Sequence, residues 1–271
     1  PYPDAMVLDD AVERSSWERL TRTMRAMGRQ VGPAAGLGTA ALKRHPVWQG
    51  AVAEGRGVGV VVVPGFGGVD ASMMVLRRWL ESCGYRTVGA GLGMNIGCTE
   101  VLVERLAARV EQHVQRTGRP VIMLGHSRGG LLCRLLVVQR PELACGLVTL
   151  GSPVLNPLDV KGLAAIALPW VLRASAMGVG GLIDKGCLDG PCRDLTAHGL
   201  AAELPVPAVA FFSRDDGVVG WESCRDPHAD WVEVTSSHTG MGTDPVLYTA
   251  LAPRLAGWAA AQGDPGPAGI A

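Results

Sequence analysis

The 271-residue sequence has no net charge and few aromatic residues: 25 basic side chains balance 25 acidic ones, and Phe, Trp and Tyr make up 5%. Nucleic-acid binding needs a basic surface for the phosphates and, for single strands, aromatic rings on which bases stack. We therefore expect no nucleic-acid partner. Hydrophobic residues reach 48% and charged residues only 18%, which indicates a globular chain with enough length for a substantial core.

A secretion signal, with a basic segment followed by an apolar one, is also absent. The chain begins at Pro1, so this absence leaves the compartment open, with the cytoplasm slightly favoured. Residues 1–50 are expected to form a helical preamble, including a helix over residues 9–27, that packs against the main domain; a membrane-surface helix is the alternative. Residues 263–271 are expected to be a disordered tail.

The seven cysteines are an odd number, so at least one thiol has no partner within the chain. Cys83, Cys133 and Cys145 lie in apolar segments and are expected in the core. Cys187 and Cys192 bracket a turn-forming stretch, and the sequence leaves open whether they form a local disulfide or stay free. No second Cys or His pair stands at ligand spacing, so we predict no metal site.

The stretch Gly125-His126-Ser127-Arg128-Gly129 has the pattern G-x-S-x-G. An apolar run precedes it and a helix-like apolar run follows it. Together these segments predict a strand, a tight turn and a helix, which would raise the Ser127 hydroxyl at a helix N-terminus. We interpret Ser127 as a nucleophile; the alternative is an ordinary turn serine.

Strand and helix patterns alternate along most of the chain. The expected strands cover residues 58–63, 86–90, 121–124, 147–150, 206–213 and 231–235. This alternation predicts an α/β domain over residues 51–262, with a mostly parallel sheet and helices on both faces. The alternation stops between about residues 154 and 204. Residues 162–183 are nearly all apolar but carry Pro169 and Arg173, which favours an inserted cap over a membrane span.

A serine nucleophile needs a histidine base, held by an acid, and in this kind of fold the acid and then the histidine follow later strands. Asp216 follows the strand over residues 206–213, and His238 follows the strand over residues 231–235. Asp215 is the rival acid. His228 lies at the wrong end of the sheet, and the elbow is expected to direct His126 away.

The negative charge that develops on a reacting carbonyl needs two fixed N–H donors. We expect one from the backbone of Arg128 and the other from the backbone of Phe66, whose ring can also face an acyl chain. Trp170, in the apolar segment of the cap, is the candidate substrate contact. The glycine run at residues 89–93 lacks G-x-G-x-x-G spacing, so no nucleotide or other cofactor is expected.

Four motifs carry a family resemblance: Val63-Pro-Gly-Phe-Gly-Gly, Gly125-His-Ser-Arg-Gly, Ser213-Arg-Asp-Asp-Gly-Val-Val and Ser237-His-Thr-Gly-Met-Gly. In this order they resemble the signature of the α/β-hydrolase superfamily, and more narrowly its bacterial lipases and esterases. The resemblance covers residues 58–260. It implies serine acyl-hydrolase chemistry on Ser127, Asp216 and His238, with oxyanion donors from Phe66 and Arg128.

The expected substrate is a small-molecule ester or a lipid-like acyl compound, with transient membrane-surface contact and the oligomeric state left open. An acyltransferase or thioesterase would use the same three residues. A non-catalytic binding module on the same scaffold is the alternative from another functional class.

Overall fold

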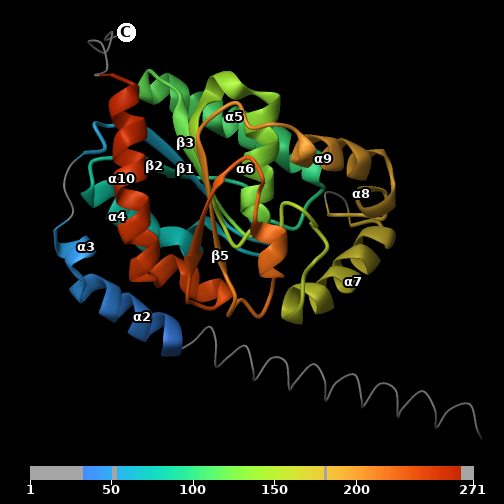
Figure 1. The fold of residues 1–271 in the computed structure, drawn as a ribbon. Helices are drawn as coiled ribbons and strands as arrows, with labels where there is room; N and C mark the ends of the chain where they lie inside the picture. Colours follow the sequence, from blue (N-terminus) through green and yellow to red (C-terminus); the bar gives the residue numbers. More distant parts are fainter. Residues whose placement is uncertain (1–32, 51–53, 180–181, 264–271) are drawn as a thin grey trace, which may run out of the picture.

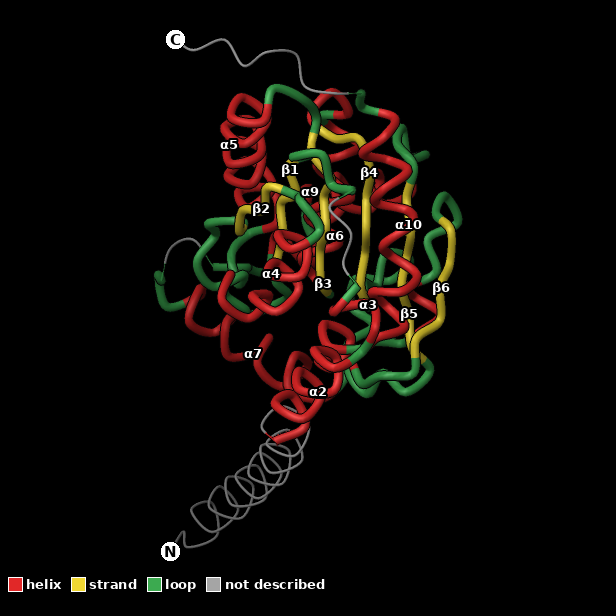
Figure 2. The backbone as a smooth tube through the Cα atoms, turned by 90° about the vertical axis from the view of Figure 1, so that its left-hand side faces the viewer, coloured by secondary structure: helices red, strands yellow, loops and turns green. Residues whose placement is uncertain are grey.

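A computed structural model describes residues 33–50, 54–179 and 182–263, so the predicted helix over residues 9–27 and most of the predicted tail lie outside it. Six parallel strands form one sheet in the order β2-β1-β3-β4-β5-β6 (Figures 1 and 2). The strands are β1 (Gly59–Val63), β2 (Arg86–Gly89), β3 (Val121–His126), β4 (Ala144–Leu150), β5 (Ala208–Ser213) and β6 (Asp230–Val234). The predicted parallel sheet is confirmed.

Helices cover both faces of the sheet, as predicted (Figure 1). One face packs against α2 (Pro33–Arg44), α3 (Pro46–Gln49), α4 (Met74–Ser82) and α10 (Pro245–Ala261), and the other against α5 (Thr99–Thr117) and α6 (Arg128–Gln139). Every residue of β1 is buried, because Val60 and Val62 face the first layer while Val61 and Val63 face the second. A continuous β-branched run suits such a strand, which has no solvent side.

The cap lies between β4 and β5, where the alternation of patterns stops in the sequence. It contains α7 (Gly162–Ala176), α8 (Gly186–Asp189) and α9 (Pro191–Ala201), which lie together at one end of the molecule (Figure 1). Leu200 of α9 is buried in the same apolar cluster as the residues of α5 and α6. No helix in the described part of the chain is both long enough and apolar enough to cross a membrane.

Short 3₁₀ turns complete the secondary structure: η1 (Asp70–Met73), η2 (Pro141–Leu143), η3 (Trp221–Cys224) and η4 (His238–Thr243). The turn η1 directly precedes α4, which begins at Met74. The Asp70 carboxylate, at the start of η1, accepts the backbone N–H groups of Ala90 and Gly91, both at 3.0 Å, and so fixes the loop after β2.

The N-termini of α5 and α10 are capped differently. Thr99 is the first residue of α5 rather than its cap, and Cys98 takes the N-cap position. Asp244 does cap α10, because its carboxylate accepts the N–H of Val246 at 2.9 Å and Pro245 takes the first helical position.

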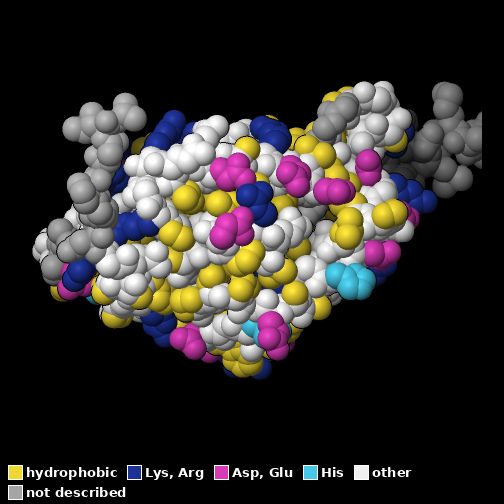
Figure 3. Space-filling model, turned by 90° about the horizontal axis from the view of Figure 1, so that it is seen from above, with side chains coloured by type: hydrophobic (Ala, Val, Ile, Leu, Met, Phe, Trp, Pro, Cys, Tyr) yellow, Lys and Arg dark blue, Asp and Glu magenta, His cyan; other side chains and the backbone are white. Residues whose placement is uncertain are grey.

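Figure 3 shows one face of the molecule in space-filling form. On its described residues, basic and acidic side chains are interspersed among apolar ones and do not gather into a continuous basic surface. The even balance of charges in the composition therefore extends to their distribution on this face.

A buried ion pair, not predicted from the sequence, joins three parts of the fold. Arg134 of α6 and Asp226, in the loop before β6, meet at 2.5 Å, with side chains 0% and 1% exposed. The same guanidinium donates to the carbonyl oxygens of Gly199 and Ala202, at the end of α9. Both charges are therefore compensated, and the pair fixes the cap against the helix that follows Ser127.

Removal of one partner from this pair should be strongly destabilising, because the other charge stays buried without compensation. We expect Asp226→Ala to lower the free energy of unfolding by about 3–5 kcal/mol. Urea denaturation measures this. The control is Glu142→Ala, which removes one carboxylate from the exposed pair with Arg140 and should leave the midpoint near that of the wild type. Equal midpoints for the two variants would contradict the prediction.

Candidate active site

Ser127 occupies a sharp turn between β3 and α6, with φ at +54° and ψ at −126°. A side chain on either flanking glycine would prevent this turn. A methyl group on Gly125 would lie 2.4 Å from the carbonyl carbon of Gly129, and one on Gly129 would lie 2.4 Å from the Val63 carbonyl oxygen. The Ser127 N–H donates to the Leu150 carbonyl at 2.7 Å, which fixes the turn against β4. This is the strand–turn–helix arrangement that the G-x-S-x-G pattern predicts.

The structure brings Asp216 and His238 together, although 22 residues separate them. His238 Nδ1 lies 2.6 Å from Asp216 Oδ2, and the two side chains are 7% and 1% exposed. Burial alone would raise the pKa of Asp216. The hydrogen bond from His238 and those from the N–H groups of Val218 and Val219 outweigh it and lower that pKa, so Asp216 stays ionised. His238 therefore donates from Nδ1, which leaves Nε2 free to accept a proton.

Asp215 takes no part in this pair. Asp215 is exposed, and its backbone N–H donates to the Ser213 hydroxyl at 3.1 Å. Of the two adjacent carboxylates, Asp216 is therefore the one that contacts His238.

Two contacts place the Asp216–His238 pair beside the serine turn. A methyl group on Gly151, which directly follows β4, would lie 3.1 Å from His238 Nδ1 and 3.2 Å from Asp216 Oδ2. The φ of Gly151 is +54°, which also favours glycine there. In the described structure the Ser127 hydroxyl makes no hydrogen bond to His238, and such bonds are often long before substrate binds.

His126 makes the second contact, and the expectation that it points away from the site is wrong. Its ring lies 4.6 Å from the ring of His238, centroid to centroid, and its Nε2 lies 2.9 Å from the His238 carbonyl oxygen. Because a carbonyl only accepts, Nε2 carries the proton. Burial lowers the pKa of His126 to about 3, so the ring is a neutral donor that positions the backbone of His238.

Arg128 follows the nucleophile and begins α6, so its backbone N–H has no acceptor within the helix. Its side chain points elsewhere. The guanidinium donates to the carbonyl and side-chain oxygens of Asn95, both at 3.0 Å, to the Gly97 carbonyl at 2.6 Å and to the Thr99 hydroxyl at 3.2 Å. Burial lowers its pKa to about 10, which leaves it charged at neutral pH. Arg128 can therefore offer its N–H to a substrate while its charge fixes the loop before α5.

Phe66 lies on the loop that follows β1. Asn95 fixes this loop from the other side, because its amide donates to the Pro64 carbonyl at 2.8 Å. The ring of Phe66 lies 5.9 Å from the Arg128 guanidinium and lines the cavity described next.

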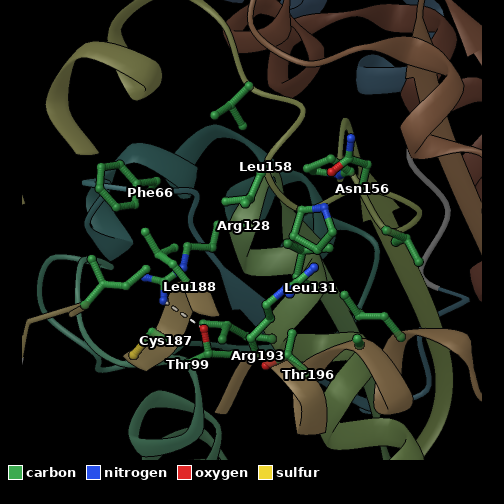
Figure 4. Close-up of a pocket in the computed structure, with 18 of the residues that line it drawn as sticks. Phe66, Thr99, Arg128, Leu131, Asn156, Leu158, Cys187, Leu188, Arg193 and Thr196 are labelled. Carbon is green, nitrogen blue, oxygen red and sulfur yellow. Dashed lines mark hydrogen bonds between the residues drawn. The ribbon is translucent and has the colours of Figure 1, made fainter. Parts of the chain in front are cut away.

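A cavity of about 400 Å³ opens from Ser127 and Phe66 beneath the cap (Figure 4). Most of its wall is apolar and comes from α6, the segment after β4, and the cap. Trp170 does not line it: this side chain is 67% exposed, and Leu168 is the residue of α7 that contributes to the wall. The expected contact between α7 and the cavity exists, but through a different residue.

Three thiols of the described chain lie together at the edge of this cavity. The sulfur atoms of Cys98, Cys187 and Cys192 are all within 4.8 Å of one another, and none of the three is in a disulfide. The sequence around Cys187 and Cys192 contains no further metal-ligating residue at suitable spacing. The fold brings Cys98 to this pair from a distant segment.

Comparisons with known proteins identify the fold. The mature form of the Bacillus licheniformis lipase BlEst2 is 16% identical, with 74% of this chain and 92% of that chain covered and a TM-score of 0.53. A structure from work on LipS and LipT, two metagenome-derived lipolytic enzymes, is 20% identical, with 76% and 94% covered and a TM-score of 0.53. The Paleococcus ferrophilus monoacylglycerol lipase is 17% identical, with 74% and 94% covered and a TM-score of 0.50.

No protein-family model and no curated protein matches this chain. At identities this low the structural likeness concerns the fold alone, and the fold is that of the α/β-hydrolases.

The two adjacent carboxylates provide a matched test of the acid. We expect Asp216→Asn to lower kcat by on the order of 10⁴, because an amide cannot hold His238 in the tautomer that accepts a proton. Asp215→Asn should keep nearly full activity, since Asp215 is exposed and the carboxylate that bonds to His238 is that of Asp216. Steady-state kinetics on an activated ester measures both. Equal, mild losses would place the acid elsewhere.

Proposed function

We propose that this chain, which has the α/β-hydrolase fold, hydrolyses carboxylic esters through an acyl-enzyme on Ser127. The observation that carries the proposal is the buried Asp216–His238 hydrogen bond of 2.6 Å beside a serine in the strained turn between β3 and α6. Such a combination of acid, base and raised hydroxyl supports nucleophilic acyl transfer.

In the proposed reaction the Ser127 oxygen attacks the ester carbonyl while His238 Nε2 takes the serine proton. Asp216 stabilises the imidazolium that forms. The backbone N–H groups of Arg128 and Phe66 would bind the oxyanion of the tetrahedral intermediate. Its collapse releases the alcohol, which receives the proton from His238. Water, deprotonated by the same histidine, then attacks the acyl-enzyme and releases the acid.

The wall of the cavity supports an apolar acyl group as the part of the substrate that binds there. Leu131 and Leu132 of α6, Leu188 of α8 and Leu200 of α9 lie around the space next to Ser127. The proteins of similar fold are described as lipases or lipolytic enzymes, which agrees with this substrate class.

Covalent labelling tests the proposed nucleophile directly. A fluorophosphonate should modify the wild-type protein at Ser127, and peptide mass spectrometry would locate the label. Ser127→Ala should abolish labelling and lower the rate of ester hydrolysis about 10⁶-fold. Ser72→Ala, at an exposed serine on η1, is the control and should label normally. Ester hydrolysis by Ser127→Ala at the wild-type rate would refute the proposal.

The contribution of α7 to the cavity predicts a dependence on acyl chain length. Each buried methylene should contribute up to about 0.8 kcal/mol, so kcat/KM for p-nitrophenyl esters should rise about fourfold per carbon until the cavity is full. Leu168→Ala should remove the contact of about two methylenes and lower the preference for long chains roughly fifteenfold.

Trp170→Ala, on the same helix but exposed, is the matched control and should leave the chain-length profile unchanged. Should acetate be the best substrate, with the same profile for Leu168→Ala as for the wild type, the proposed acyl site in this cavity would be wrong.

A further inference from the structure

The cluster of Cys98, Cys187 and Cys192 has no role in the ester chemistry proposed above. Its members come from three separate elements: Cys98 is the N-cap of α5, Cys187 lies in α8 and Cys192 in α9. Cys187 also lines the cavity (Figure 4). The cluster therefore joins the cap to the main domain at the edge of the candidate active site.

The distances between the sulfur atoms match a shared metal ion better than a disulfide. In a tetrahedral zinc site with Zn–S bonds of about 2.3 Å, two sulfur atoms are about 3.8 Å apart. Cys98 and Cys192 are 3.8 Å apart, and all three sulfurs lie within 4.8 Å of one another. A disulfide needs about 2.05 Å and would use only two of the three thiols.

A divalent ion would bind these three sulfurs as thiolates, because ligation displaces the thiol protons to solvent. The positive charge of the ion would then compensate the negative charges of the adjacent thiolates.

Arg128 provides a second, independent observation. In the part of the chain that the structure describes, its buried guanidinium hydrogen-bonds only to neutral oxygens, those of Asn95, Gly97 and Thr99. Gly97 and Thr99 are the residues on either side of Cys98, so the guanidinium lies beside the cluster. Three thiolates and one divalent ion carry a net charge of −1, which the guanidinium offsets.

We propose that Cys98, Cys187 and Cys192 bind one zinc ion, which fastens α8 and α9 of the cap to the N-terminus of α5. Within the described residues no other Cys, His, Asp or Glu offers a ligand atom within 4.8 Å of all three sulfurs, so water completes the tetrahedron. This proposal replaces the prediction of no metal site, which considered only ligands close together in the sequence.

Metal content of the full-length protein tests the proposal without reference to activity. Protein from zinc-supplemented cells, dialysed exhaustively under reducing conditions, should retain about one zinc per chain by plasma mass spectrometry. Replacement by Co²⁺ should give a near-ultraviolet sulfur-to-cobalt charge-transfer band and the strong visible bands of a tetrahedral site. Chelation of the zinc should lower Tm.

Alanine variants identify the ligands. Cys98→Ala, Cys187→Ala and Cys192→Ala should each lose zinc and the charge-transfer band, while Cys145→Ala, at a buried cysteine of β4, should keep both. If a ligand variant fails to fold by circular dichroism, the wild-type cobalt spectrum still decides. A zinc-free wild type without the charge-transfer band would overturn the proposal, as would an intact mass lower by two hydrogens that shows a disulfide within the cluster.

Discussion

The position of Ser127 is the constraint on which the rest of the site depends. A serine at φ +54° and ψ −126° has a backbone conformation that residues other than glycine rarely adopt, and this strain costs about 1–3 kcal/mol. The turn persists because its surroundings determine it: Gly125 and Gly129 pass within contact of each other, and the Ser127 N–H bonds to the carbonyl at the end of β4. Gly151, which the Asp216–His238 pair contacts, directly follows β4. The same strand therefore fixes the serine turn and sets how closely this pair can approach Ser127.

Arg128 shows how one residue serves the site through its backbone and its surroundings through its side chain. Its N–H lies at the start of α6 and is one of the two expected oxyanion donors. Its guanidinium hydrogen-bonds to the loop before α5, whose Asn95 in turn bonds to the loop that carries Phe66. The two expected oxyanion donors are therefore joined through a single hydrogen-bonded chain. A large cationic residue at this position does not make the cavity strongly polar, because its charge is directed at loop oxygens.

Local patterns in the sequence predicted the strands, the serine turn and the choice of Asp216 and His238, because each depends on a strand end and the few residues after it. Contacts between distant segments were not predictable in this way. The Arg134–Asp226 pair spans 92 residues, the His126 contact spans 112, and Cys98 lies 94 residues from Cys192. The apolar segment around Trp170 predicts a contact with substrate, but the face that α7 turns toward the cavity is set by packing, which composition does not reveal.

The cap is held unequally along its length, and this bears on how substrates could be selected. Its α9 is fixed by Arg134, whose guanidinium bonds to two of its terminal carbonyls, and by Leu200, which is buried against α5 and α6. The described side chains of α7, in contrast, include none that is fully buried. Segments with few buried contacts open at lower free-energy cost than the core. The wall of the cavity formed by α9 is therefore the more firmly held part, and α7, which contributes Leu168, is held by fewer buried contacts. A metal ion at the cysteine cluster would reinforce this division, because all of its cap ligands lie in α8 and α9 and none in α7.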